Sequence, residues 1–281
     1  MNKWIVGARP RTLPAAIAPV LVATAYAGSN WSPIRALAAL LVSLSLQIGV
    51  NYANDYSDGI RGTDDSRIGP VRLTASGLAS PKSVRNAALI SFLLAALVGL
   101  TLAAATSWWV ILVGAGAINA AWGYTGGAKP YGYVGLGEIS VFLFFGVVAT
   151  VGSYYVQVEE LNLQIFIIAI PMGSLACAIL AINNLRDRAQ DEVVGKKTLA
   201  VRLGDKGARR LYIALLISAH LFALLTFKPA AALTLLAAPM TWKLARGVAS
   251  GISGADLIPF LARTGKLQLV FALLYALGLL L

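Results

Sequence analysis

The chain has 281 residues, of which 58% are hydrophobic and only 12% are charged, and its formal net charge is +11. A soluble globular domain is about half apolar and about a quarter charged, so this composition excludes an ordinary soluble protein. A strong positive charge can indicate nucleic-acid binding, but here the basic residues are confined to particular connections between apolar runs, which argues against that interpretation.

The apolar runs predict transmembrane helices, because about 20 mostly apolar residues are needed to cross a hydrocarbon core. Short connections between the runs leave no room for a separate soluble domain. We therefore predict an all-α, polytopic membrane protein with nine transmembrane helices that form a single domain over residues 1–281. The expected spans are 12–28, 34–56, 86–105, 107–124, 137–157, 163–184, 210–227, 230–246 and 266–281.

The basic residues alternate between the connections. Apart from Arg35 and Lys228, every lysine and arginine lies in the N-terminal segment or in an even-numbered connection. Cytoplasmic segments of membrane proteins carry such an excess of basic residues. We therefore expect the N-terminus and the two long polar loops, 57–85 and 185–209, in the cytoplasm. Nine spans then leave the C-terminus outside.

The single cysteine and the single histidine limit the chemistry that the chain can carry. Cys177 has no second cysteine with which to form an internal disulfide bond, and one histidine, His220, allows no cysteine–histidine metal cluster. We expect both side chains to pack inside membrane helices.

Two polar stripes lead from membrane helices into the long cytoplasmic loops. Residues three and four apart share one face of a helix. Acidic side chains and amides inside a membrane are costly, so they are candidates for a functional site. Their oxygen atoms suit Mg²⁺, which commonly binds one or two carboxylates together with substrate phosphates. The stripes are Asn51, Asn54 and Asp58 on the second span, and Asn183 or Asn184, Asp187 and Asp191 on the sixth.

Basic residues in the same loops would complete a site for a phosphate-bearing ligand at the membrane surface. The candidates for this phosphate cradle are Arg61, Arg67, Arg72, Arg186, Lys196 and Lys197. Several arginines are instead expected to set topology or to contact lipid headgroups: Arg67, which belongs to both sets, Arg85, Arg188, Arg209 and Arg210.

A glycine-rich, aromatic turn follows the fourth span at 122–133. It contains Tyr124, Lys129 and Tyr131, and Glu138 follows where the fifth span begins. Glycines permit tight turns and close helix packing. A lysine among aromatic rings also suits an anionic aromatic substrate or a diphosphate.

The motifs resemble those of the UbiA superfamily of intramembrane prenyltransferases. The two aspartate-rich motifs of that superfamily match NDYSD at 54–58, followed by Asp64, and NNLRDRAQD at 183–191, followed by GKKTLA at 195–200. The late position of Asp64 departs from the general pattern and looks like the branch that prenylates 1,4-dihydroxy-2-naphthoate in menaquinone synthesis. ARPRTLP at 8–14 and KPYGY at 129–133 are also similar to that branch, and the resemblance covers nearly the whole chain.

The resemblance implies an enzyme of a bacterial plasma membrane that has a central chamber capped by cytoplasmic loops. It implies transfer of a polyprenyl group from polyprenyl diphosphate to 1,4-dihydroxy-2-naphthoate, with loss of diphosphate and carbon dioxide, to give demethylmenaquinone. Mg²⁺ would assist ionisation of the donor to an allylic cation. The lipid bilayer would receive the apolar tail, and no nucleic acid would take part.

The polar stripes, the basic loops and the resemblance together give a set of expected site residues. The resemblance implies that the metal ligands are Asn54, Asp58, Asp187 and Asp191. The residues expected to carry catalysis are Asp58, Asp64, Asp187, Asp191 and Lys129. The residues expected to bind the substrates are Arg9, Asn51, Arg61, Arg72, Tyr124, Tyr131, Asn184, Arg186 and Lys197.

Other functions stay open from the sequence. The acceptor could be 4-hydroxybenzoate, homogentisate, haem or a chlorophyllide, although the position of Asp64 and the turn around Lys129 argue against these. A secondary transporter would also place acidic residues in the membrane, but nearer the midplane and between broken helices. A purely structural membrane protein leaves the two paired motifs unexplained.

Overall fold

The structure is a computed structural model that describes residues 2–63, 69–226 and 228–281. Every regular element in these three ranges is helical, as expected from the sequence. The elements are α1 (Lys3–Ala8), η1 (Pro10–Thr12), α2 (Pro14–Ala27), η2 (Gly28–Asn30), α3 (Pro33–Ile60), α4 (Pro81–Ala105), α5 (Trp109–Gly123), η3 (Tyr131–Val134), α6 (Gly137–Val141), η4 (Phe142–Val148), α7 (Ala149–Val158), α8 (Leu163–Val193), α9 (Leu199–Leu224), η5 (Pro229–Ala237), α10 (Ala238–Ala249), η6 (Gly254–Leu257) and α11 (Ile258–Leu280).

Side-chain caps explain where the long helices begin. The Ser32 and Ser80 hydroxyls accept hydrogen bonds from backbone N–H groups in the first turns of α3 and α4, and a proline follows each serine at the first helical position. Asn162 and Thr198 cap α8 and α9 in the same way. Such caps satisfy N–H groups that have no partner within the helix, and proline is tolerated directly after them.

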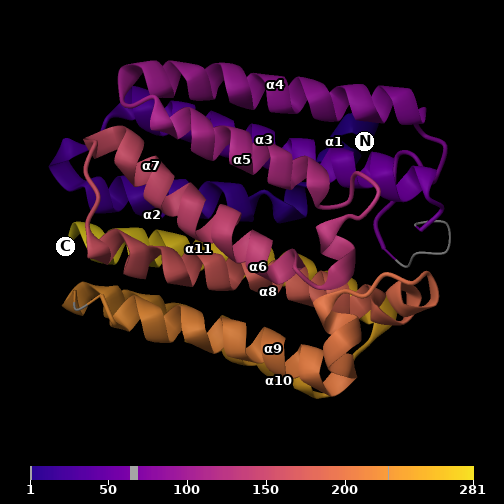
Figure 1. The fold of residues 1–281 in the computed structure, drawn as a ribbon. Helices are drawn as coiled ribbons and strands as arrows, with labels where there is room; N and C mark the ends of the chain where they lie inside the picture. The colour runs from indigo at the N-terminus through magenta and orange to yellow at the C-terminus, as the bar shows by residue number, and fades with distance from the viewer. Residues whose placement is uncertain (1, 64–68, 227) are drawn as a thin grey trace.

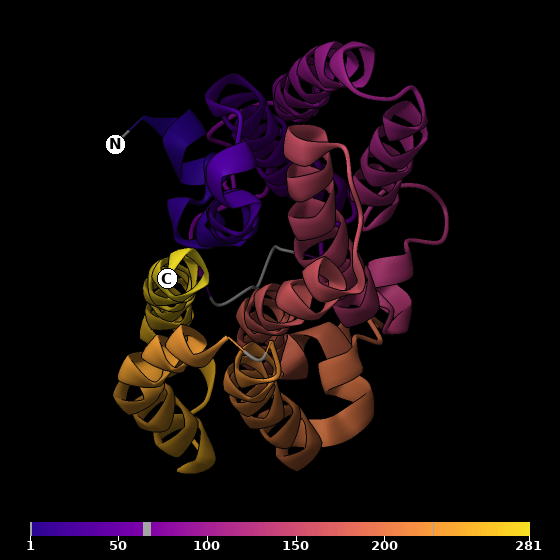
Figure 2. The same cartoon turned by 90° about the vertical axis from the view of Figure 1, so that its left-hand side faces the viewer.

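The long helices lie side by side, and the chain returns repeatedly from one end of the bundle to the other (Figure 1). Neighbouring pairs are α3 with α4, α8 with α9, and α2 with α11. The view along the helix axes shows the N-terminal half on one side of the bundle and the C-terminal helices on the other (Figure 2). The connections after α3 and α8 lie at the same end of the bundle, opposite the C-terminus (Figure 1), so the two aspartate motifs are brought together there.

Six helical segments in the described ranges are long and apolar enough to cross a membrane, and a seventh is reached if the bent pair Lys3–Thr12 and Pro14–Asn30 counts as one span. The predicted number of nine is therefore not confirmed. α5 has only 15 residues, and residues 229–249 form a 3₁₀ helix and the short α10 instead of one apolar α-helix. Large apolar side chains such as Ile34, Leu93 and Leu112 are exposed on the outside, as expected of a surface that faces lipid.

Two irregularities shape the interior of the bundle. Arg9, between α1 and η1, has a left-handed backbone with φ of 51°, which is rare outside glycine. The chain then bends by 53° between the segments Lys3–Thr12 and Pro14–Asn30. The π-helical segment η4 packs against α8 where Gly146 meets Gly173, and a Cβ on Gly146 would lie 2.4 Å from the Gly173 Cα. This close approach requires glycine.

The expectation that Arg209 contacts lipid headgroups is wrong. Its side chain is buried and donates hydrogen bonds to the backbone oxygens of Val248 at 2.7 Å and Ile252 at 2.9 Å. It also forms an ion pair with Asp205 at 2.7 Å. Arg209 therefore fastens α9 to the C-terminal end of α10, where a positive charge complements the helix dipole.

Candidate functional site

A cavity of about 730 Å³ runs inside the bundle between the α3 and α8 motifs. Its volume lies within the range of small-molecule sites. Helices α3, α4, α5, α7 and α8 and the segment η4 all contribute to its wall. The polar and charged side chains that line it include Arg9, Thr12, Gln47, Asn51, Asn54, Asp58, Arg72, Tyr124, Tyr131, Asn183, Asn184, Arg186, Asp187, Asp191 and Lys196.

The α3 stripe meets residues of two later segments at the polar end of the cavity. Asp58 is buried, and it accepts hydrogen bonds from the Tyr133 hydroxyl at 2.6 Å and from Lys196 Nζ at 3.3 Å. The Lys196 ammonium also lies 4.7 Å from the centre of the Tyr133 ring. Burial and the adjacent Asp58 carboxylate raise the pKa of Tyr133 well above its usual range, so its phenol stays protonated and donates. Asn54 Oδ1 accepts from the Thr125 hydroxyl at 2.8 Å.

The α8 stripe is also buried and internally paired. The Arg186 guanidinium donates two hydrogen bonds to the Asp187 carboxylate, at 2.7 and 2.8 Å, and one to Asn183 Oδ1 at 2.9 Å. Asn184 Nδ2 donates to Glu138 Oε1 at 3.0 Å. This arrangement keeps an arginine between the acidic and amide groups of α8, where it would meet the negative charge of a diphosphate.

The side-chain oxygens at this end of the cavity are of the types that bind Mg²⁺. They are carboxylate and amide oxygens, and they come from two helices that face one cavity. In the part of the chain that the structure describes, no three acidic, histidine or cysteine side chains gather closely enough to hold a metal alone. A Mg²⁺ ion at this end would complete its coordination with substrate phosphates and water.

The predicted site residues divide into two groups. Eleven of them line the cavity: Arg9, Asn51, Asn54, Asp58, Arg72, Tyr124, Tyr131, Asn184, Arg186, Asp187 and Asp191. Arg61, Lys129 and Lys197 are exposed and do not line it. Arg61 donates to the backbone oxygens of Thr125 and Gly127, so it holds the glycine-rich turn in place. Asp64 lies outside the residues that the structure describes.

Lys196, a candidate for the phosphate cradle, also lines the cavity. Several other residues at the site were not predicted. Thr12, Gln47 and Ser140 line the wall, and the Tyr133 hydroxyl donates a hydrogen bond to Asp58. Gln47 carries a detectable signal, since it continues the helical stripe of Asn51 one turn deeper into the membrane. Thr12 gives no such signal, because its contact with α3 joins residues far apart in the sequence.

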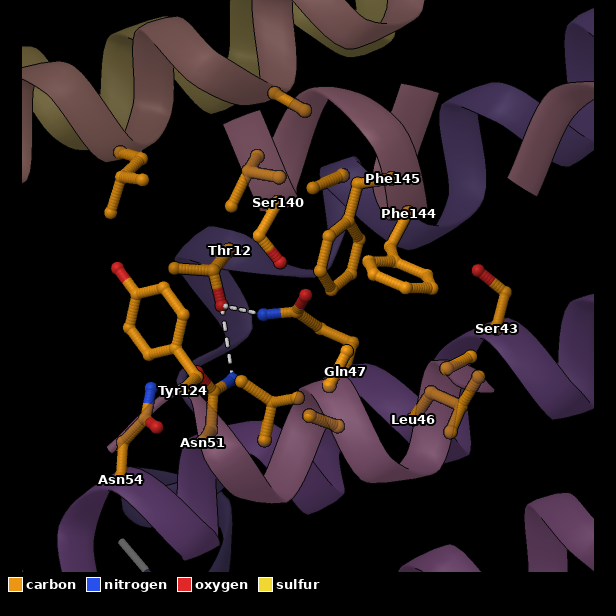
Figure 3. A pocket seen from close by; sticks show the side chains of 18 of the residues that line it. Thr12, Ser43, Leu46, Gln47, Asn51, Asn54, Tyr124, Ser140, Phe144 and Phe145 are labelled. Atoms are coloured by element: carbon orange, nitrogen blue, oxygen red, sulfur yellow. Dashed lines mark hydrogen bonds between the residues drawn. The ribbon is translucent and has the colours of Figure 1, made fainter. Parts of the chain in front are cut away.

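The remainder of the wall is apolar and roomy. Gly99, Gly114 and Gly152 line it from three different helices, and a Cβ built on any of them meets no other atom within 4 Å. Gly99 lies about 27 Å along α4 from its start at Pro81, so the cavity extends far from the acidic end. Phe144 and Phe145, both in the π-helical segment, also line it (Figure 3).

Comparisons with known proteins point to the family that the motifs resemble. The model of the UbiA prenyltransferase family matches residues 16–256. A 1,4-dihydroxy-2-naphthoate octaprenyltransferase of Mycobacterium tuberculosis is 51% identical, and the match covers 98% of this chain and 95% of the relative. The enzyme of the same name from Escherichia coli is 40% identical, over 98% and 94%. A UbiA homologue from Archaeoglobus fulgidus, solved with DMAPP and Mg²⁺, has a TM-score of 0.68 at 17% identity, with 99% of each chain covered, and shares the fold.

Proposed function

Because the chain belongs to the UbiA prenyltransferase family, we propose that it transfers a polyprenyl group from a polyprenyl diphosphate to 1,4-dihydroxy-2-naphthoate. The observation that carries the proposal is the full-length similarity, at 51% and 40% identity, to two enzymes named for that reaction. Diphosphate and carbon dioxide would leave, and the product would enter menaquinone biosynthesis as the reduced, hydroquinone form of demethylmenaquinone.

The polar end of the cavity would bind the diphosphate. Mg²⁺, when bound, would neutralise the charge that develops on the leaving diphosphate. Its ligands would be Asn54, Asp58, Asp187 and Asp191. The matched neighbour bound to DMAPP and Mg²⁺ supports this assignment by analogy of fold alone.

Basic side chains around the same end would share the charge. Lys196 and Arg186 already lie against Asp58 and Asp187, and both line the cavity. Arg9 and Arg72 line it as well. A diphosphate that approaches these cations would exchange their carboxylate partners for phosphate oxygens, which would free the carboxylates to bind metal.

The carbon–oxygen bond of the donor would break with its electron pair on the diphosphate, leaving an allylic cation. Apolar walls exclude the water that would quench this cation. The ring faces of Tyr124 and Phe145, both on the wall, could stabilise it by cation–π contact. The electron-rich acceptor ring would then form the new carbon–carbon bond, and loss of its carboxylate as carbon dioxide would return an electron pair to the ring.

The finer topology belongs to the same proposal. We infer nine membrane segments, in which α5 and the residues of η5 and α10 are embedded although they fall short of a full apolar span. The N-terminus and the loops over the polar end would face the cytoplasm of a bacterial plasma membrane, and the C-terminus would face outward.

The test is product formation by the purified protein with polyprenyl diphosphate, 1,4-dihydroxy-2-naphthoate and Mg²⁺. Asp187→Asn should abolish turnover while the protein still folds. Glu192→Gln is the matched control, because Glu192 follows Asp191 on α8 but is exposed and does not line the cavity. Full activity of the Asp187→Asn variant would contradict the assignment of Asp187 as a metal ligand. Absence of any prenylated product with the wild-type protein would refute the proposed reaction.

A further inference from the structure

A polar cluster that belongs to neither aspartate motif lies on the cavity wall, deeper in the membrane. It consists of Thr12, Gln47 and Asn51 (Figure 3). Gln47 is only 6% exposed and Asn51 only 3%. Gln47 lies about 16 Å along α3 from Asp58, at 1.5 Å per residue. The cluster is therefore separate from the carboxylates at the polar end, although it faces the same cavity.

The hydrogen bonds of this cluster fix the orientation of both amides. Asn51 Nδ2 donates to the backbone oxygen of Ala8 at 2.9 Å, and a carbonyl oxygen can only accept. The Thr12 hydroxyl donates its one proton to the backbone oxygen of Arg9 at 3.0 Å. Thr12 Oγ1 must then accept from its other two neighbours, which are Gln47 Nε2 at 3.0 Å and Asn51 Nδ2 at 3.1 Å. Two backbone carbonyls thus determine which way each amide points.

The amide oxygens of both residues are consequently turned away from Thr12. No hydrogen bond from a described residue reaches Gln47 Oε1 or Asn51 Oδ1, while both side chains line the cavity. The Gln47 oxygen points toward the side of the cavity where Ser140 and Phe145 lie (Figure 3). Both oxygens are accessible from the cavity and have no donor among the described residues, so a ligand that donates two hydrogen bonds would satisfy them.

The spacing of the two acceptors restricts that ligand further. Gln47 and Asn51 are four residues apart on α3, which places their Cβ atoms about 5–6 Å apart on one face. Two hydroxyl groups on opposite carbons of one aromatic ring span a similar distance. Phe145 on the facing segment offers an apolar surface for such a ring. A ring with a single hydroxyl group would leave one of the amide oxygens without a donor.

We propose that Gln47 and Asn51 form the acceptor subsite and select a 1,4-dihydroxy aromatic ring by accepting a hydrogen bond from each hydroxyl. Thr12 acts as the positioning residue that holds both amides in the accepting orientation. The inference rests on the proposed function, since it assigns the recognition of that reaction's acceptor to named residues. It predicts that an acceptor with one phenolic hydroxyl, such as 4-hydroxybenzoate, is disfavoured.

The first test uses the wild-type enzyme and needs no variant. 1-Hydroxy-2-naphthoate and 4-hydroxy-2-naphthoate each lack one of the two hydroxyl groups. As inhibitors competing with 1,4-dihydroxy-2-naphthoate, each should bind about tenfold more weakly than the dihydroxy compound, because each loses one of the two hydrogen bonds to the amide oxygens. If both analogues bind as well as the dihydroxy compound, the proposal is overturned.

The second test uses Gln47→Met, which keeps the size of the side chain and removes the acceptor. It should raise the KM for 1,4-dihydroxy-2-naphthoate about tenfold and leave the KM for polyprenyl diphosphate unchanged. It should weaken one monohydroxy analogue and spare the other, which has no hydroxyl for Gln47. Ser43→Ala is the matched control one turn further along α3, and it should leave both KM values unchanged. If Gln47→Met fails to fold, the analogue comparison decides alone.

The outcomes separate the two claims. A wild-type enzyme that forms no prenylated naphthoate overturns the proposed function and this inference with it. An active wild-type enzyme whose Gln47→Met variant keeps its acceptor KM, or loses affinity equally for both analogues, overturns this inference and leaves the proposed reaction standing.

Discussion

Arg209 offers a quantitative test of the packing of the C-terminal helices. Replacing it with alanine removes two short hydrogen bonds to the backbone oxygens of Val248 and Ile252 and the ion pair with Asp205. Each bond from a charged donor contributes about 1.5–3 kcal/mol. The Asp205 side chain is 44% exposed, so solvent screening limits the ion pair to at most about 1 kcal/mol.

We therefore expect Arg209→Ala to destabilise the fold by about 3–5 kcal/mol, as for other buried charged contacts. In a thermal melt of the purified protein this corresponds to a decrease in Tm on the order of 10 °C. Arg210→Ala is the control, because Arg210 is the next residue and is exposed. Its effect should stay within about 0.5 kcal/mol. Equal Tm values for the two variants would refute the structural role of Arg209.

Three further predictions concern the site. Gly114 lines the apolar part of the cavity, where we expect the long donor tail to lie. Gly114→Leu should therefore lower kcat/KM for a long polyprenyl diphosphate about tenfold relative to geranyl diphosphate, whereas Gly116→Leu, on the exposed face of α5, should not. Equal effects of the two substitutions would contradict this placement of the tail. Lys196→Ala should raise the KM for polyprenyl diphosphate far more than Lys129→Ala does, because Lys196 lines the cavity beside Asp58 and Lys129 is exposed; equal KM values would contradict the assignment of Lys196 to the diphosphate site. The raised pKa of Tyr133 adds stability that is complete below about pH 10 and is lost as the pH rises through the folded-state pKa. In EDTA, the wild-type Tm should therefore fall more steeply above about pH 10 than that of Tyr133→Phe, and parallel curves would contradict this.

The helices could be predicted well from hydropathy, but their number could not. Each expected span falls on a helical segment, and the serines before Pro33 and Pro81 cap helices as their positions suggest. Hydropathy does not distinguish a 3₁₀ helix from an α-helix, so the apolar run at 230–246 was interpreted as one full span. It also does not register that α5 ends after 15 residues.

The two acidic stripes could be predicted because helical periodicity places their members on one face. Both stripes do line a common cavity. Periodicity cannot tell which lysine reaches that cavity, since this depends on how a loop folds back. Lys129 was expected there and is exposed, whereas Lys196 lies against Asp58.

The contacts between distant segments could not be predicted from the sequence. Thr12 binds Gln47 because the N-terminal segment packs against α3. Glu138 was recognised as the start of a helix, but its hydrogen bond to Asn184 depends on the packing of α6 against α8. Such pairings are set by tertiary structure and leave no spacing signature in one sequence.

The most direct test of the central claim is a competition assay with 1,4-dihydroxy-2-naphthoate labelled in its carboxyl carbon, polyprenyl diphosphate, Mg²⁺ and excess 4-hydroxybenzoate. The account predicts a Mg²⁺-dependent prenylated 1,4-dihydroxynaphthalene, which air oxidises to the naphthoquinone during recovery, and the release of one labelled carbon dioxide for each product molecule. Prenylated hydroxybenzoate as the main product, or prenylated naphthoate that keeps its label, would contradict it.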